Sequence, residues 1–175
     1  VFIGFRYEVG GDYNSYIKFY YTLRLHDTYV NAILVSGGDT LYNLVNVFFA
    51  KMNLQISSVN LVCAGIFCFG LYYYAKNQKY PILVLIVGFP YLILVVGLGY
   101  TRQATAIGIF LISIEFLKNK KISIFFILII FASLFHKTAL VLLGFGFLTQ
   151  KKNRIIIFIS TVILGLILFF ILLAK

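Results

Sequence analysis

Long apolar runs separated by short charged gaps fill the chain from residue 57 onward. Ser57–Ala75 and Ile155–Ala174 are 19 and 20 residues long and contain no charged side chain. About 20 apolar residues in a helix are needed to cross the roughly 30 Å hydrocarbon core of a bilayer. Both runs therefore predict transmembrane helices, and Pro81–Gly99 predicts a third, with Pro90 as a place for a kink.

Three further apolar runs are shorter than a usual membrane-spanning helix. They are Gln103–Leu117, Ile122–Phe135 and Thr138–Thr149, with 15, 14 and 12 residues. Flanking lysines can lengthen such helices by reaching toward water, or a pair of helices can enter the membrane part-way where protein shields it. The pattern thus predicts about six membrane segments, one or more of them re-entrant.

The charged gaps between these runs alternate between lysine-rich and lysine-poor. Since loops rich in Lys and Arg stay in the cytoplasm, the first, third and fifth gaps are expected there. The second and fourth gaps, with Arg102 and His136, are then expected outside, as are residues 1–56. A single crossing by residues 122–149 would separate two lysine clusters, so the chain is expected to turn back at Phe135–Thr138. The cytoplasmic set is Lys76, Lys79, Lys118, Lys120, Lys121, Lys151, Lys152 and Arg154.

Residues 1–56 carry an amphipathic pattern. After Asp12 and again after Asp39, apolar side chains recur at the i, i+3, i+4, i+7 spacing of a helix with one apolar face. Their many aromatic rings suit the headgroup level, so we expect two helices that lie on the outer membrane surface or cover the bundle. The predicted fold is an all-α polytopic transmembrane helix bundle (57–175) with an outer segment (1–56). Because the chain opens without Met, we interpret it as a fragment of a longer membrane protein.

Composition excludes several classes of protein. The chain is 62% hydrophobic and 11% charged, against roughly 25% charged in soluble domains, which excludes an ordinary soluble domain. The formal net charge of +10 comes from cations in short gaps between apolar runs, so nucleic acid is not an expected partner. We find no metal-ligand spacing of His, Cys, Asp or Glu, and expect neither a metal nor a cofactor.

One group of polar side chains falls on the predicted outer side and carries the candidate chemistry. Carboxylates can act as general bases, an arginine fork can hold a phosphate, and histidine can do either. Arg102 also stands at the N-terminal end of a predicted helix, where free N–H groups favour an anion. The set suits a phosphate-bearing substrate, and its members are Arg6, Glu8, Asp12, Asp39, Arg102 and His136.

Each of these residues also has a purely structural interpretation. Asp12 and Asp39 stand where helix N-caps are expected. Arg102 can serve only to orient the chain in the membrane, and His136 can bond a backbone carbonyl between packed helices. Glu115 is expected to form a structural ion pair with the lysine three residues later.

Four segments, in order and spacing, resemble the EpsG-like family of bacterial polysaccharide polymerases of the Wzy type. The chain has Asp39 where that family commonly has Glu, and a shorter side chain reaches a different point. The segments are Arg6-Tyr-Glu-Val-Gly-Gly-Asp12-Tyr13-Asn-Ser-Tyr16, Gly38-Asp39 ahead of Leu44-Val45-Asn46, Tyr100-Thr101-Arg102-Gln103-Ala104, and Phe135-His136-Lys137-Thr138-Ala139.

The resemblance implies an enzyme similar in architecture to glycosyltransferases with lipid-linked donors. Such polymerases work at the outer face of the bacterial cytoplasmic membrane, where they join oligosaccharide repeat units carried on undecaprenyl diphosphate into a capsule or exopolysaccharide. Arg6, Arg102 and His136 would hold the diphosphate, Asp12 would be the first candidate base and Asp39 the second. Membrane lipid and other polysaccharide-assembly proteins are the further expected partners.

Three alternatives stay open. One is a glycosyltransferase that adds a single lipid-linked unit, and another is a transporter or flippase of lipid-linked sugars, which would carry ionisable residues near mid-bilayer. The third is a non-catalytic membrane subunit, in which changes to the polar set would leave activity intact.

Overall fold

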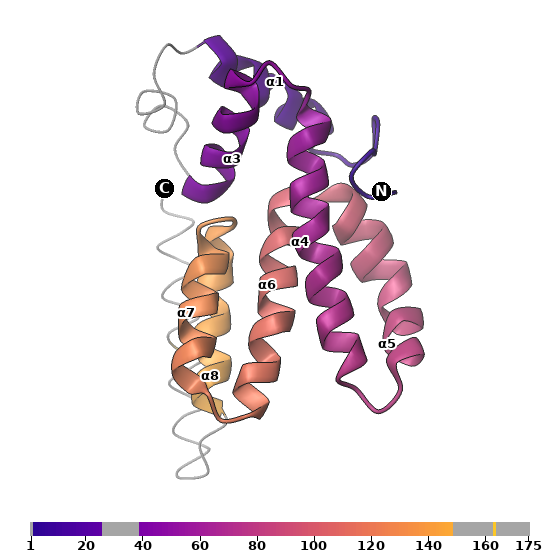
Figure 1. Ribbon diagram of the computed structural model, residues 1–175, viewed down its shortest axis with the longest axis vertical. Helices are drawn as coiled ribbons and strands as arrows, with labels where there is room; N and C mark the ends of the chain where they lie inside the picture. The colour runs from indigo at the N-terminus through magenta and orange to yellow at the C-terminus, as the bar shows by residue number, and fades with distance from the viewer. Residues whose placement is uncertain (1, 26–38, 149–162, 164–175) are drawn as a thin grey trace.

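The computed structural model describes residues 2–25, 39–148 and 163, and the described chain is a helical bundle without strands (Figure 1). The predicted helix at 155–174 lies outside these residues. The bundle is formed by α4 (Ile56–Lys76), α5 (Pro81–Gly88) with its π-helical continuation η1 (Phe89–Gly97), α6 (Thr101–Lys118), α7 (Ile122–Ser133), the 3-10 helix η2 (Lys137–Leu143) and α8 (Gly144–Leu148). Two helices, α1 (Tyr13–Leu25) and α3 (Thr40–Lys51), lie across one end.

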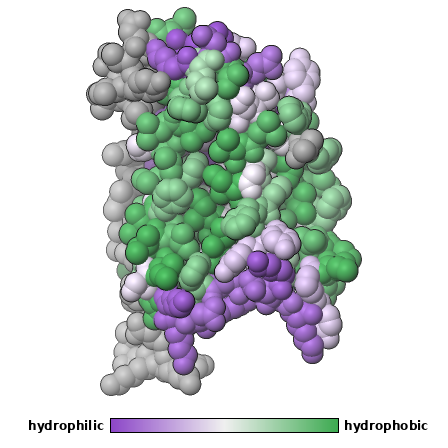
Figure 2. Space-filling model, viewed as in Figure 1, coloured by the Kyte–Doolittle hydropathy of each residue, from purple (hydrophilic) through white to green (hydrophobic). Residues whose placement is uncertain are grey.

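Successive segments of the bundle run in opposite directions. The connections after α4 and α6 lie at one end and those after η1 and α7 at the other, and the connection after α7 lies next to α3 (Figure 1). As predicted, the chain turns back after α7, where His136 adopts an extended conformation. The first two lysine-rich gaps therefore meet at one end, which we call the lysine end; the opposite end is the Arg102 end. Figure 2 shows an apolar belt between two hydrophilic ends.

The predicted membrane spans are confirmed only in part. Within the described residues, α4 is the one helix that is long and apolar enough to cross a membrane. The run predicted as Pro81–Gly99 is helical throughout, and its Pro81–Gly97 part is one of the shorter apolar helices. Instead of a single kinked α-helix, the winding changes from α to π at Phe89, beside Pro90. Proline has no N–H to donate to the turn before it, which favours such a change.

Helix α6 is the centre of the bundle, between α4 and α7. Its contact with α4 depends on two glycines: a Cβ placed on Gly70 would lie 2.0 Å from the Gly108 carbonyl oxygen. Small residues at such a crossing allow the two backbones to approach closely. This close packing determines where the first turn of α6, with Arg102, sits relative to the start of α4.

The two amphipathic helices cover the bundle, which decides between the two predicted placements. Tyr16 of α1 and Tyr42 of α3 belong to one buried core together with Cys63 of α4, Ile109 of α6 and Phe135 after α7. Burying large aromatic side chains stabilises such a cover by about 1.5–3 kcal/mol each. The end of the bundle and its cover therefore form one packed unit at the Arg102 end.

Gly10 makes a close backbone contact that holds the N-terminal segment against the start of α6. Its φ of +97° is unfavourable for residues with a side chain, and an added Cβ would lie 2.8 Å from both Cα and O of Gly99. We expect Gly10→Ala to destabilise the fold by about 1–3 kcal/mol, because neither backbone can move aside freely. Thermal unfolding in detergent, followed by circular dichroism, measures the change.

Gly11→Ala is the matched control for this variant, because a Cβ there meets no atom within 4 Å. It should unfold at the wild-type temperature or slightly above. Equal unfolding temperatures for the two variants would show that the contact with Gly99 contributes nothing to stability.

Candidate functional site

Asp39 joins three segments at the Arg102 end. Its Oδ1 accepts a hydrogen bond of 2.9 Å from the Lys137 backbone N–H, and its Oδ2 lies 3.0 Å from Arg102 Nη1. The carboxylate is only 3% exposed. It stands at the N-cap of α3 but makes no side-chain capping bond, so the expected capping role is wrong for its side chain. Both carboxylate oxygens instead interact with partners outside α3, the Lys137 N–H and the Arg102 guanidinium.

Arg102 is the second residue of α6, which begins at Thr101, two residues before the predicted Gln103. Its guanidinium carbon lies 5.4 Å and 5.8 Å from the ring centres of Tyr16 and Tyr42, within cation–π range. The N-cap residue of α6, Tyr100, makes no side-chain capping bond. A cation held by Asp39 therefore stands beside the unpaired backbone N–H groups of a helix start, an arrangement that attracts anions.

A cavity of about 360 Å³ opens beside this arginine. Two buried polar atoms at its wall, Arg102 Nε and Tyr42 Oη, have no hydrogen-bond partner in the part of the chain that the structure describes. Unpaired polar atoms in a buried wall are costly unless a ligand or water completes them. The cavity is lined by Asp12, Ser15, Tyr16, Phe19, Tyr42, Asn43 and Arg102.

His136 approaches the same group through Asp39. Its Nδ1 lies 3.7 Å from Asp39 Oδ2, too far for a hydrogen bond but close enough for attraction when the ring is protonated. The side chain is 27% exposed and does not line the 360 Å³ cavity. The alternative role of bonding a carbonyl between helices is not seen, since Nδ1 has no hydrogen-bond partner among the described residues.

The structure separates the two candidate carboxylates into different environments. Asp12 lines the cavity with Arg102 and is partly exposed, whereas Asp39 is buried and already engaged. A carboxylate that must accept a proton from a substrate needs access to it. Asp12 meets this condition, and Asp39 is placed to position Arg102.

Arg6 does not lie in the cavity of Arg102. Its guanidinium donates hydrogen bonds to the Leu98 carbonyl and to Thr101 Oγ1, and the residue is 8% exposed. It thus ties the N-terminal segment to the connection between η1 and α6. Arg6 and Arg102 line different cavities, so this arrangement gives no support to the expectation that both hold the same diphosphate.

The surroundings of Asp39 change its acidity. Burial by itself raises the pKa of this carboxyl, but the His136 ring, the Lys137 N–H and the Arg102 guanidinium outweigh it and lower the pKa below its ordinary value of 3.8. A carboxylate with a lowered pKa is a weaker base, which again favours a positioning role for Asp39.

A pH titration of stability tests this network. Because the pKa of Asp39 is lowered in the folded protein, its ionised form stabilises the fold above about pH 4, and this contribution is lost as the pH falls through the folded pKa. We expect the wild-type thermal unfolding temperature to fall below about pH 4, and Asp39→Asn to start lower at neutral pH and fall less. Parallel curves for the two proteins would contradict the assignment.

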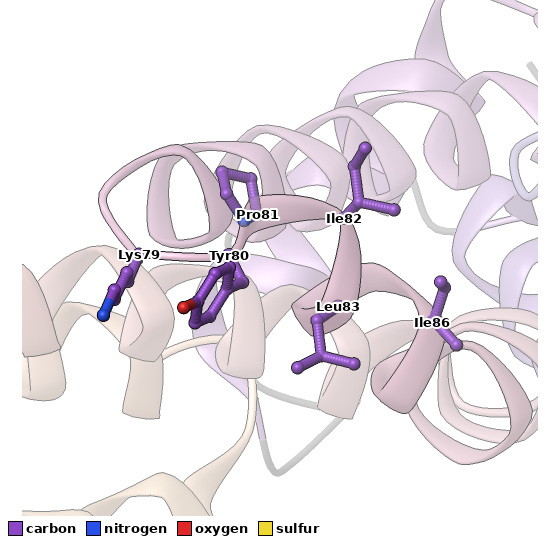
Figure 3. A pocket seen from close by; sticks show the side chains of 6 residues that line it. All are labelled: Lys79, Tyr80, Pro81, Ile82, Leu83 and Ile86. Atoms are coloured by element: carbon purple, nitrogen blue, oxygen red, sulfur yellow. The ribbon is translucent and has the colours of Figure 1, made fainter.

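A larger hollow lies at the lysine end and differs in chemistry. It has a volume of about 480 Å³ at the start of α5, and Figure 3 shows its mainly apolar side chains around the first turns of that helix. Among the residues that the structure describes, no carboxylate or arginine lines it. It lacks the pairing of a carboxylate with an arginine that the Arg102 end offers, and its lining is Lys79, Tyr80, Pro81, Ile82, Leu83 and Ile86. The lysine end otherwise carries the expected ion pair, with Lys118 Nζ 2.8 Å from Glu115 Oε1.

Tyr16 and Tyr42 belong to the site although their chemistry was not predicted from the sequence. Each follows a candidate aspartate by three or four residues, so each lies near that aspartate on the same helical face. This spacing from a candidate aspartate was the feature of the sequence that could have indicated the two tyrosines as site residues. Their rings are in edge contact at 5.9 Å and form the surface on which Arg102 rests.

Fold and site together define a helical membrane bundle with a polar cavity covered by two aromatic-rich helices at one end. The chain belongs to the EpsG family, whose family pattern matches residues 1–175, the whole chain. It is accordingly a membrane protein of polysaccharide biosynthesis. No curated protein and no solved structure matches it.

Proposed function

We propose that this protein is a polysaccharide polymerase that joins oligosaccharide repeat units carried on undecaprenyl diphosphate. The observation that carries the proposal is the cavity in which Arg102, at a helix N-terminus, faces the same space as the accessible carboxylate of Asp12. A reaction that expels a diphosphate while deprotonating a hydroxyl needs these two groups in one place.

The proposed step is a glycosyl transfer. A sugar hydroxyl of one lipid-linked unit attacks the anomeric carbon of the growing chain, so that a new C–O bond forms as the bond to the diphosphate oxygen breaks. The bonding electron pair leaves with undecaprenyl diphosphate, whose developing charge Arg102 and the α6 N-terminus stabilise. Asp12 accepts the hydroxyl proton. Asp39 holds Arg102 in place, and His136 adds positive charge behind Asp39 when protonated.

We propose that the Arg102 end faces outward from the cytoplasmic membrane, with residues 1–56 outside. Five lysines lie in the two described gaps at the opposite end, which supports a cytoplasmic location for it. In the described helices the charged side chains gather at the two ends. This placement favours chemistry at one surface over transport through the bundle, for which charges at mid-bilayer are expected.

The experiment is a reconstitution in detergent with the full-length protein and the lipid-linked repeat unit. Micelles have no two sides, so a transporter yields no product there, whereas a polymerase yields a ladder of repeat lengths on a gel. A product one unit longer than the substrate would indicate a single-addition glycosyltransferase. If the substrate stays unchanged with this protein alone, and a ladder forms only through the activity of added partner proteins, the result would indicate a non-catalytic subunit.

A further inference from the structure

A second cavity of about 430 Å³ lies on another face of α1. It is bounded by the N-terminal segment, α1 and the start of α4. Four aromatic side chains and two buried polar ones dominate its wall: Phe5, Tyr7, Tyr13, Tyr21, Arg6 and Asn60. We call it the aromatic groove.

Helix α1 separates the aromatic groove from the cavity of Arg102. Positions 12, 15, 16 and 19 line the Arg102 cavity, and positions 13, 17 and 21 line the aromatic groove. The first set follows the i, i+3, i+4, i+7 spacing of one helical face and the second the i, i+4, i+8 spacing of another, and at 100° per residue the two faces are roughly 150° apart. Two ligands bound in these cavities would therefore lie on nearly opposite sides of the same helix.

Two buried side chains of the aromatic groove, Arg6 and Asn60, also line a small neighbouring cavity beside Cys63 and Thr101, and each has a polar atom without a partner among the described residues. Arg6 and Asn60 are 8% and 4% exposed, and neither Arg6 Nε nor Asn60 Oδ1 has a hydrogen-bond partner within the described residues. One is a donor and the other an acceptor. Such atoms cost free energy when buried unless a bound molecule completes their hydrogen bonds.

The chemistry of this wall fits a neutral, hydroxyl-rich ligand better than an anion. Each terminal nitrogen of Arg6 already donates a hydrogen bond, to Leu98 and to Thr101, so the guanidinium is held by the protein and its fork is not free to bind a phosphate through two parallel bonds. The wall also offers the Arg6 Nε donor, the Asn60 Oδ1 acceptor and exposed rings: Tyr7 and Tyr21 are 73% and 55% exposed. Sugars combine C–H faces that pack on aromatic rings with hydroxyls that both donate and accept.

We propose that the aromatic groove binds the saccharide of the acceptor substrate, while the Arg102 cavity holds the diphosphate of the donor. This assignment rests on the proposed function, since a polymerase must bind two saccharide substrates at once. The groove supplies specificity for the sugar, and the Arg102 cavity supplies the charge that the leaving group needs.

The test is a binding measurement with the full chain in detergent micelles. The probe is the free repeat-unit oligosaccharide, released by mild acid from the lipid-linked precursor of the same cells, and saturation-transfer NMR reports its contact with the protein. We expect the double variant Tyr7→Ala/Tyr21→Ala to bind at least tenfold more weakly than the wild type. Both side chains are mostly exposed, so the fold should persist.

Tyr72→Ala is the matched control, because Tyr72 is 62% exposed but lies near the opposite end of α4. It should bind the oligosaccharide like the wild type. Inorganic diphosphate should not displace the oligosaccharide, since it is expected in the other cavity. Displacement, equal binding by the double variant, or no binding by the wild type would each overturn the assignment.

Arg102→Ala separates this assignment from the proposed function. It should stop polymer formation and still bind the free oligosaccharide. If Arg102→Ala polymerises normally while binding still depends on Tyr7 and Tyr21, the proposed function fails and the saccharide groove stands. If polymerisation needs Arg102 but replacing both tyrosines leaves oligosaccharide binding unchanged, the assignment of the groove is wrong and the proposed function stands.

Discussion

Polymer formation is expected to stop when Arg102 is replaced by alanine, and to recover only in part with lysine. Arg102 is the guanidinium that faces the cavity beside Asp12. Removing one preorganised group that stabilises developing charge costs about 10²–10³ in rate. Lysine restores a charge near Asp39 but lacks the planar fork that can hold a phosphate through two bonds. Polymer length on gels and the initial rate of unit transfer measure both effects.

The alanine variant also leaves the Asp39 carboxylate buried without its charged partner, which by itself can lower the free energy of unfolding by about 3–5 kcal/mol. The double variant D39N/R102A avoids this unpaired charge, and we expect it to accumulate better than R102A while still making no polymer. Arg24→Ala is the matched control: Arg24 is an exposed arginine of α1 that bonds Asn53. Full-length polymer from both Arg102 variants at normal protein levels would refute the diphosphate role.

Asp12→Asn is expected to slow transfer by about 10²–10⁴ without unfolding the protein, since this is the usual contribution of a general base. The amide keeps the size of the side chain at the cavity wall but cannot accept the hydroxyl proton. The initial rate of transfer, measured at saturating lipid-linked substrate, is the readout. Asp39→Asn should instead lower thermal stability, because it removes the buried partner of Arg102.

Glu8→Gln is the control for Asp12→Asn, because Glu8 is an exposed carboxylate of the same segment that does not line the Arg102 cavity. Its transfer rate should equal that of the wild type. A normal rate in Asp12→Asn, together with a large loss in a folded Asp39→Asn protein, would move the base from the first carboxylate to the second.

Much of the fold follows from local pattern. The apolar run at 57–75, the turn after Phe135 and the two helices behind Asp12 and Asp39 were all predictable, because hydrophobic periodicity and run length act over neighbouring residues. The π winding of η1 was not, since it depends on how the chain packs around Pro90 as well as on the proline itself.

The site was predictable as a set of residues but not as an arrangement. Arg102, Asp39 and His136 do gather at one end, as the alternating charges of the gaps indicated. Their pairing could not be predicted from the sequence, because the partners are far apart along the chain: Asp39 is separated by 63 residues from Arg102 and by 98 from Lys137, from whose N–H it accepts a hydrogen bond. The position before a helix favoured a capping role for Asp39, and tertiary contacts replaced it.

The amino-acid sequence alone determined the helical class, the direction of successive segments and the end at which the reactive side chains collect, because these depend on the length, apolarity and flanking charge of each segment. Only the tertiary structure decided which carboxylate is buried against Arg102 and which faces the cavity. It also decided that Arg6 lines a different cavity from Arg102. These outcomes depend on the packing of α1 and α3 over the bundle, which brings together side chains that no local pattern connects.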